Sequence, residues 1–261
     1  MSEDNELLYR IEDGIGWITL NRPQARNALT FGMYERLAEI CRTVGDDTAV
    51  KVLVISGAGE KAFAAGTDIA QFRAFKTAED AEGYEGRIDA VLSAVERCPK
   101  PTIAAIAGAC TGGGAGIAAA CDLRIASKDL RFGFPIARTL GNCLSINSLA
   151  RLSALIGQAR VRELIFTARL VGAEEALASG LVSEVLEDRV AVMSRAQGLA
   201  ETLSGHAPLT LQATKEGLRR LREAASQLDD SDLIQLCYLS EDFREGLEAF
   251  LGKRRPTWKG R

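Results

Sequence analysis

The first half of the chain alternates short apolar runs with longer segments of helical periodicity. Glu6–Arg10 and Gly14–Leu20 flank the turn Glu12-Asp13-Gly14 and predict a β-hairpin. Val50–Ile55 and Thr102–Ala107 are continuous apolar runs, which are typical of parallel strands covered on both faces. Single helices between such strands predict an α/β fold with right-handed crossovers.

The other elements follow from periodicity, caps and breakers. Helices are expected after an N-cap at Thr30 to about residue 44, and at 78–97, 115–120, 145–155, 158–166 and 173–179. Short extended segments are expected at 63–68, 122–126, 131–134, 170–171 and 181–185. After residue 188 the chain is expected to be helical, at 189–204, 208–225 and 230–251. The predicted organisation is a mixed α/β core, 1–188, followed by a C-terminal helical region, 189–261.

The stretch Pro99–Cys121 is the most unusual part of the sequence. An apolar strand leads through the bare turn Gly112-Gly113-Gly114 into a helix of small residues that is expected to be buried on all sides. Three successive glycines are entropically unfavourable, so the turn needs either positive φ or a close approach to its backbone. Free N–H groups at the start of a helix suit a developing oxyanion, although a tight strand–helix turn without a ligand gives the same pattern.

Composition excludes several classes of function. The 261 residues are 47% hydrophobic and 26% charged with a net charge of −3, so we expect no nucleic-acid partner. The acidic N-terminus shows no secretory signal, and no apolar run is long enough for a membrane span. Six scattered cysteines without metal-ligand spacing indicate free thiols, a cytoplasmic protein and no metal site. The single histidine, His206, is expected to be exposed in a loop.

Five segments together are similar to the crotonase, or enoyl-CoA hydratase/isomerase, superfamily. They occur in the order and at the spacing of that family, and they are ITLNRPQARNAL (18–29), VKVLVISGAGEKAFAAGTDI (50–69), KPTIAAIAGACTGGGAGIAAACDLRIAS (100–127), FTARLVGAEEALASGLVSEV (166–185) and EGLEAFLGKRRPTW (245–258). The resemblance implies an α/β spiral of ββα units. It also implies a C-terminal helical region that covers the coenzyme A site and forms trimers, often paired as hexamers.

The resemblance also implies an acyl-CoA thioester as substrate, with coenzyme A entering as part of it and no tightly bound cofactor. The thioester oxygen would lie between the backbone N–H groups of Thr67 and Gly113, each worth on the order of 3 kcal/mol to a developing enolate. The remaining positions that match the family's coenzyme A contacts are Arg26, Ala64, Ala65, Asp68, Ile69, Phe250 and Lys253.

The sequence departs from the family at both glutamates that hydratases use. Gly116 stands at one position and Ile136 at the other, and neither side chain carries a proton. Hydration needs both an acid and a base, and losing either typically lowers the rate about 10² to 10⁴ fold. Cys143 follows Gly141-Asn142 where some members carry a nucleophilic aspartate, so a cysteine nucleophile and a buried apolar thiol both stay open.

We therefore expect an acyl-CoA enzyme of the hydratase/isomerase group, a lyase or isomerase of fatty-acid metabolism. Its chemistry would rest on an enolate or oxyanion held by two backbone N–H groups. Decarboxylation, thioester hydrolysis and a dehalogenase-like displacement require least from side chains. A non-catalytic acyl-CoA-binding protein is the alternative from another class.

Overall fold

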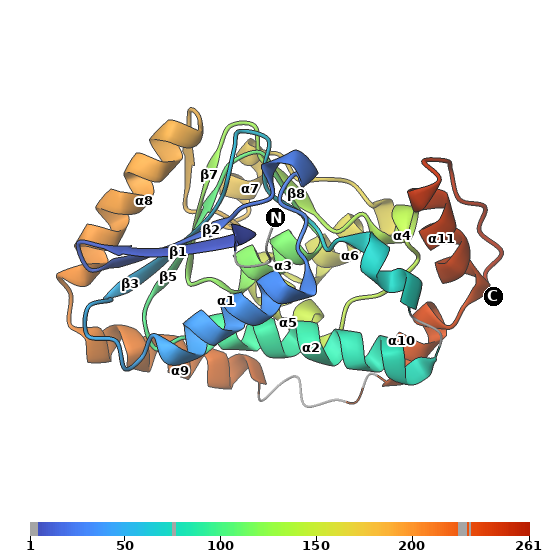
Figure 1. Ribbon diagram of the computed structural model, residues 1–261, viewed down its shortest axis with the longest axis horizontal. Helices are drawn as coiled ribbons and strands as arrows, with labels where there is room; N and C mark the ends of the chain where they lie inside the picture. The colour runs from blue at the N-terminus through green and yellow to red at the C-terminus, as the bar shows by residue number, and fades with distance from the viewer. Residues whose placement is uncertain (1–4, 75–76, 224–228, 230) are drawn as a thin grey trace.

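The structure is a computed structural model that describes residues 5–74, 77–223, 229 and 231–261. The chain winds as a spiral, and after an opening hairpin and helix three successive turns each add a strand to a larger sheet, a strand to a smaller sheet and then a helix (Figure 1). The expected α/β fold of ββα units is thereby confirmed. None of the helices in the described part of the chain combines the length and hydropathy needed to span a bilayer.

The larger sheet has the strand order β1-β2-β3-β5-β7-β9, six strands within the described residues. Their bounds are β1 (Leu7–Glu12), β2 (Ile15–Leu20), β3 (Val52–Gly57), β5 (Thr102–Ile106), β7 (Leu123–Ser127) and β9 (Glu184–Leu186). β1 and β2 form the predicted hairpin, and its turn residues Asp13 and Gly14 both have positive φ, 51° and 80°. The other neighbours pair in parallel, as the continuous apolar runs predict.

The smaller sheet is parallel, with the order β4-β6-β8. Its strands are β4 (Ala62–Ala65), β6 (Ala109–Thr111) and β8 (Arg131–Gly133). β6 is absent from the strands expected from the sequence, which assign no element between the apolar run and the triple glycine. Three residues are too few to show alternation, and they become a strand because β4 and β8 supply partners on both sides.

The helices that follow the strands lie mostly where periodicity places them. Their bounds are α1 (Phe31–Thr43), α2 (Ala78–Glu96), α3 (Gly113–Ala120), α5 (Ile146–Ile156), α6 (Gln158–Thr167) and α7 (Ala173–Ala178). The 3₁₀ helix η3 (Ile69–Ala74) follows Asp68, a residue type that favours the start of a helix, whereas η2 (Pro23–Ala25) and the short α4 (Ile136–Thr139) lie where no element is predicted. α3 is buried from Gly114 to Ala120, which confirms a helix enclosed on all sides.

The C-terminal region is helical, as predicted, but its last segment is divided. α8 (Arg189–Ser204) and α9 (Pro208–Glu223) are followed by α10 (Ser231–Tyr238) and α11 (Glu241–Leu251), while 224–225 and 230 lie outside the described residues. One helix over 230–251 is therefore wrong. The break occurs because Ser240 caps α11, with its hydroxyl accepting a hydrogen bond from the Phe243 amide.

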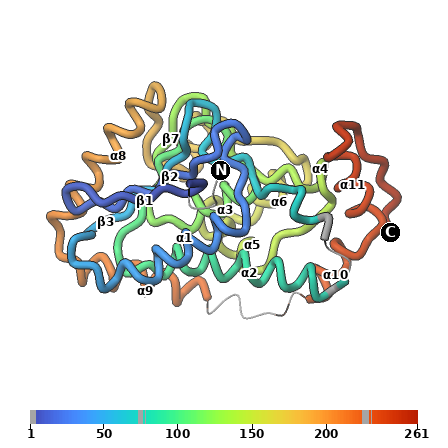
Figure 2. Tube along the Cα trace, in the orientation of Figure 1, coloured from blue at the N-terminus to red at the C-terminus, as the bar shows by residue number. Residues whose placement is uncertain are grey.

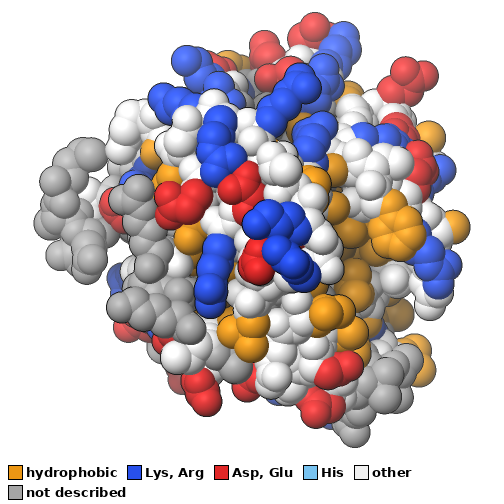
Figure 3. All heavy atoms as spheres, turned by 90° about the vertical axis from the view of Figure 1, so that its right-hand side faces the viewer, with side chains coloured by type: hydrophobic (Ala, Val, Ile, Leu, Met, Phe, Trp, Pro, Cys, Tyr) orange, Lys and Arg blue, Asp and Glu red, His pale blue; other side chains and the backbone are white. Residues whose placement is uncertain are grey.

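The two halves of this C-terminal region cover different parts of the core (Figure 2). α8 packs on one face of the larger sheet through Val192, Ala196 and Ala200, against Trp17 and Val54 among others. α10 and α11 lie at the opposite end of the molecule, where they pack against α2, α4 and η3. The surface of that end shows apolar side chains gathered beside charged ones (Figure 3).

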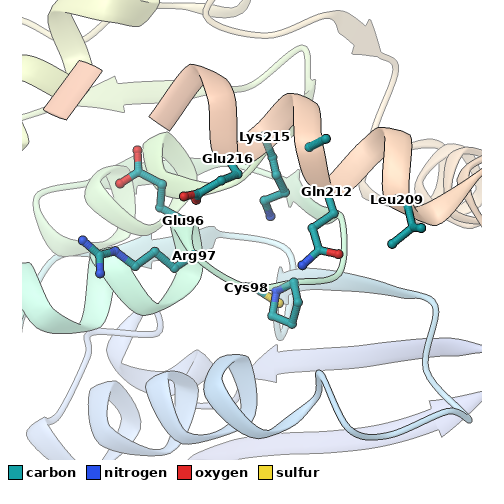
Figure 4. A pocket seen from close by; sticks show the side chains of 9 residues that line it. Glu96, Arg97, Cys98, Leu209, Gln212, Lys215 and Glu216 are labelled. Atoms are coloured by element: carbon teal, nitrogen blue, oxygen red, sulfur yellow. The ribbon is translucent and has the colours of Figure 1, made fainter. Parts of the chain in front are cut away.

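α9 is fastened to the core by ion pairs, because none of its residues is buried. Glu96 of α2 accepts hydrogen bonds from Arg151 of α5 at 3.0 Å and from Arg222 of α9 at 2.6 Å. Lys215 of α9 pairs with Asp122 at 2.6 Å, and it points toward the segment carrying Cys98 across a cavity of about 420 Å³ (Figure 4).

Replacing Glu96 with alanine is expected to destabilise the fold strongly. The side chains of Arg151 and Arg222 are 4% and 9% exposed, so the variant leaves two nearly buried guanidinium groups without their anion. We expect a loss of about 3 to 5 kcal/mol in the free energy of unfolding, measured by urea titration. The control is Glu39→Ala, which removes an exposed pair with Arg36 and should lose less than about 1 kcal/mol. Equal losses in the two variants would contradict this account of α9.

Candidate active site

Two glycine turns approach each other closely at the ends of β4 and β6. Gly66 and Gly112 have φ values of 101° and 52°, a region that side chains disfavour. A Cβ on Gly112 would lie 3.3 Å from the Cα of Gly66, so the two backbones nearly touch. The residues that follow the glycines, Thr67 and Gly113, are therefore held side by side, and the Thr67 Oγ1 atom lies 3.1 Å from an ideal Cβ on Gly113.

The backbone amides of Thr67 and Gly113 take no part in the backbone hydrogen bonds around them. Leu29 donates to the carbonyl of Gly66 and accepts from the amide of Asp68, both at 2.8 Å, so the Thr67 amide takes no part in this bridge. Gly113 is the first residue of α3, where an N–H has no partner inside the helix. Neither amide donates a hydrogen bond to another group of the described chain.

Three hydroxyl groups form a chain behind these turns. The Thr67 Oγ1 atom lies 2.9 Å from the Tyr34 hydroxyl and 3.1 Å from the Tyr84 hydroxyl. Burial raises the pKa of Tyr34 and that of Tyr84 above their usual range, so both phenols stay protonated near neutral pH. Neutral phenols at this place orient the threonine and carry no charge.

The turns open into a cavity of about 590 Å³. The residues predicted for the site that line it are Arg26, Ala65, Thr67, Asp68, Ile69, Gly113, Gly116, Ile136, Cys143 and Phe250. Two predicted residues are not brought to its wall. Ala64 is fully buried within β4, where its carbonyl packs against Gly114, and Lys253 lies exposed beyond the end of α11. The exposed His206 lies between α8 and α9 and does not line the cavity.

Comparison with known proteins identifies the family of this chain. Residues 10–261 match the model of the enoyl-CoA hydratase/isomerase family. The chain belongs to this family. It is 34% identical over 257 residues to the short-chain-enoyl-CoA hydratase of Clostridium acetobutylicum, covering 97% of each chain. It is 35% identical over 251 residues to the mitochondrial Delta(3,5)-Delta(2,4)-dienoyl-CoA isomerase of Mus musculus, covering 91% of this chain and 76% of the relative.

A solved structure is also similar over nearly its whole length. A methylmalonyl-CoA decarboxylase in complex with 2-nitronate-propionyl-CoA superposes with a TM-score of 0.88 at 28% identity, covering 98% of this chain and 99% of that one. Relatives with hydratase, isomerase and decarboxylase names thus share this fold. The chain is an acyl-CoA-processing enzyme of this family, and its reaction has to be argued from the side chains of the cavity.

Gly116 and Ile136, the two positions that the resemblance assigns to hydratase glutamates, carry no polar side chain. Gly116 and Ile136 both line the cavity. A Cβ on Gly116 would lie 3.2 Å from the Cδ1 atom of Leu92, so α2 fills the space beside this glycine with a methyl group. A water molecule at this wall would meet hydrocarbon and no base.

The sequence interpretation missed the contribution of α2 to the cavity. Tyr84, Glu85, Ile88 and Leu92 all line it, and Glu85 is only 7% exposed. The signal was present, because Ala81, Glu85, Ile88 and Leu92 follow the helical spacing of one face. A carboxylate inside an apolar stripe is a buried polar group that needs a reason.

Cys143 lies at the cavity wall but acts as a donor to its neighbours. Its thiol donates to the carbonyl oxygen of Leu233 at 3.6 Å and is also a hydrogen-bond partner of the Cys237 thiol on α10. This hydrogen bond lowers the pKa of Cys237 to about 7. Thiolate character therefore falls on Cys237, outside the cavity lining, and a nucleophilic role for Cys143 stays a prediction.

A methyl group on Gly113 is expected to disrupt the hydroxyl chain. Its Cβ would lie 1.8 Å from the Tyr34 oxygen, and such overpacking typically costs about 1 to 3 kcal/mol. Removing the obstructing Tyr34 hydroxyl should restore part of the lost free energy of unfolding. Gly113→Ala and Tyr34→Phe should therefore show a coupling energy of at least about 1 kcal/mol in a double-mutant cycle. Gly83→Ala, with nothing within 4 Å, is the control and should not destabilise. Additive effects would show that the turn and Tyr34 are not in contact.

Alkylation should reveal the thiol pair. The rate of Cys237 modification by iodoacetamide, followed by peptide mass spectrometry, is expected to be half-maximal near pH 7, because the Cys143 thiol stabilises the thiolate and lowers its pKa. Cys143→Ala should move the midpoint toward the usual value of about 8.5, whereas Cys143→Ser keeps a donor and should stay lower. Identical midpoints in all three proteins would rule the hydrogen bond out.

Proposed function

We propose that the chain binds an acyl-CoA thioester in the cavity, with the thioester oxygen between the amides of Thr67 and Gly113. Three observations support this: the turns lie side by side, both amides lack a partner in the described chain, and Gly113 begins a helix. Two such donors stabilise a developing enolate by about 3 kcal/mol each. Arg26, Asp68 and Phe250, which the resemblance assigns to contacts with coenzyme A, also line this cavity.

Decarboxylation of a malonyl-type thioester is the reaction that this cavity favours. The observation that carries this choice is the apolar wall at Gly116 and Ile136, where Leu92 occupies the space beside the glycine. Loss of CO₂ needs no base, because the breaking C–C bond leaves its electron pair in the enolate. The apolar wall also suits a carboxylate that is to leave as neutral CO₂. The similar decarboxylase structure agrees with this choice.

Double-bond isomerisation is the second candidate, and Glu85 is the observation in its favour. Moving a proton from one carbon to another needs a single group that serves as base and then as acid. Enoyl hydration needs a base for water as well, and the described cavity wall offers none at the family positions. The dienoyl-CoA isomerase relative is, by its name, an enzyme of the isomerising class.

A trimer or hexamer also stays a proposal. Leu218 and Leu221 of α9 and Leu236 of α10 are 64%, 73% and 71% exposed. A second copy of the chain that covered these leucines would remove apolar area from water, at about 25 cal/mol per Å².

Purified protein is expected to convert methylmalonyl-CoA to CO₂ and propionyl-CoA. Chromatography of the thioesters measures this conversion. A 3-enoyl-CoA tests isomerisation, and crotonyl-CoA should show hydration no faster than buffer alone. Rapid crotonyl-CoA hydration with methylmalonyl-CoA left intact would overturn the decarboxylase assignment. Calorimetry with a non-reactive acyl-CoA ether separates the remaining outcomes. Binding without any turnover indicates a binding protein, and absence of binding refutes the site itself.

A further inference from the structure

The two amides proposed to hold the thioester oxygen belong to turns that glycine makes permissive. Thr67 and Gly113 each follow a glycine with positive φ, Gly66 at 101° and Gly112 at 52°. Glycine allows these angles, but its wide range of φ and ψ does not by itself hold a peptide plane in one orientation. Two donors stabilise a developing oxyanion only when they are held within about 0.5 Å of the productive geometry. The spacing of the amides therefore depends on the groups that pack behind the turns.

One atom, the hydroxyl oxygen of Tyr34, contacts both turns from behind. It lies 2.9 Å from the Thr67 Oγ1 atom and forms a hydrogen bond with it. A Cβ on Gly113 would lie 1.8 Å from the same oxygen and 3.1 Å from the Tyr34 Cζ atom. The phenol thus occupies the space in which any other residue at position 113 would carry its side chain. Its hydroxyl sets the separation between the two residues.

Tyr34 is held firmly where it makes these contacts. It lies near the start of α1, is 2% exposed, and its amide donates to the Thr30 carbonyl at 3.1 Å. The Phe31 amide donates to the Gln71 Oε1 atom of η3 at 3.0 Å, which ties the start of α1 to the segment that follows the Thr67 turn. Burial raises the pKa of Tyr34, so the phenol is neutral near pH 7. A neutral phenol does not repel an oxyanion that develops nearby, as a phenolate would.

The position of Tyr34 limits it to an indirect role. The described residues that line the active-site cavity include Thr67, Gly113 and Tyr84 but not Tyr34. Tyr34 lines a smaller cavity of about 170 Å³ between α1 and α2. Tyr84 lines both cavities, so a change at Tyr84 would alter the surroundings of the acyl group as well. Tyr34 can therefore act on a bound thioester only through the residues that it contacts.

We propose that Tyr34 is a positioning residue that holds the amides of Thr67 and Gly113 at the separation an enolate oxygen requires, an inference that rests on the function proposed above. The amides bind a neutral thioester oxygen weakly and a charged enolate oxygen strongly, so a loss of alignment acts mainly on the enolate. Tyr34 thereby contributes to kcat without touching the substrate. The same contact accounts for glycine at position 113, because only a residue without Cβ admits the hydroxyl.

The test compares Tyr34→Phe with Tyr9→Phe, each of which removes one phenol hydroxyl. Tyr9 packs against the same core cluster as Tyr34 but lines neither cavity. Tyr34→Phe is expected to lower kcat for methylmalonyl-CoA about 10- to 100-fold, with KM changed less than about threefold. Tyr9→Phe should leave both constants unchanged. Thermal unfolding of each variant checks that the fold is intact.

Binding of two coenzyme A thioesters separates positioning from general damage. The nitronate of 2-nitropropionyl-CoA carries a delocalised negative charge next to the thioester, as an enolate does, whereas propionyl-CoA is neutral there. Calorimetry should show that Tyr34→Phe binds the nitronate about 10-fold or more weakly than wild type does, with the affinity for propionyl-CoA unchanged. A fold that was merely loosened would lose affinity for both thioesters, and that result would refute the positioning role.

Variants of Thr67 test whether the hydroxyl contact carries the effect. Thr67→Val keeps the amide and the shape of the side chain but removes Oγ1, so it should lower kcat at least as much as Tyr34→Phe does. The double variant should be no slower than Thr67→Val alone, because both changes remove the same contact. Thr67→Ser keeps the hydroxyl and should retain most of the rate, a comparison that holds even if Tyr34→Phe folds poorly. Equal rates for Thr67→Val and Thr67→Ser would contradict the proposal.

The failures of the two proposals are distinguishable. If wild type turns over a thioester and Tyr34→Phe matches it in kcat and in affinity for the nitronate, the role of Tyr34 is refuted and the proposed function stands. Independent, additive losses from Tyr34→Phe and Thr67→Val would likewise refute it, because the two side chains would then act separately. If wild type itself neither binds nor converts any acyl-CoA, the proposed function fails first and the role of Tyr34 fails with it.

Discussion

The close approach of two backbones at Gly66 and Gly112 is the constraint on which the rest of the structure depends. A peptide chain can pass another at this distance only where side chains are absent and positive φ is permitted. The approach requires β4 and β6 to pair, and it requires α3 to begin at Gly113 immediately after the turn. Two unpaired amides on adjacent turns are the consequence, and they are made of backbone alone.

The small residues of α3 extend this constraint into the core. A Cβ on Gly114 would meet the Ala64 carbonyl oxygen at 2.4 Å, so the helix can lie this close to β4 only as glycine. The same closeness at Gly116 lets α2 press Leu92 against the helix. The cavity wall at Gly116 is therefore apolar, and the carboxyl groups that line the cavity, those of Asp68 and Glu85, lie elsewhere in the chain.

The C-terminal helices act on the cavity from a distance in sequence. Tyr238 and Phe243 join Phe72 and Tyr84 in one aromatic cluster, with ring centroids 4.7 Å apart for Tyr238 and Phe243 and 4.8 Å apart for Phe72 and Tyr84. This cluster fixes α10 and α11 against α2 and η3, which places the Tyr238 hydroxyl on Glu85. α9, by contrast, is fastened by ion pairs and leaves apolar side chains exposed.

Local sequence was sufficient for elements whose signals lie within the element. The hairpin at Asp13-Gly14, the buried α3 and the Thr30 cap, whose hydroxyl accepts from Met33, all follow from neighbouring residues. The family resemblance predicted which two amides would hold an oxyanion and that both hydratase glutamates are absent. Of the site residues that the resemblance predicted, ten line the cavity, while Ala64 and Lys253 lie elsewhere.

Only the tertiary structure decided the remaining features. β6 exists because partners flank it on both sides, and the break before α11 follows where Ser240 caps a helix that packs on η3. The Tyr238 hydroxyl that donates to Glu85 lies 153 residues away along the chain, and no local pattern relates the two residues. Backbone preferences and apolar periods are properties of neighbouring residues, whereas the environment of a buried carboxyl is set by side chains that the fold brings together.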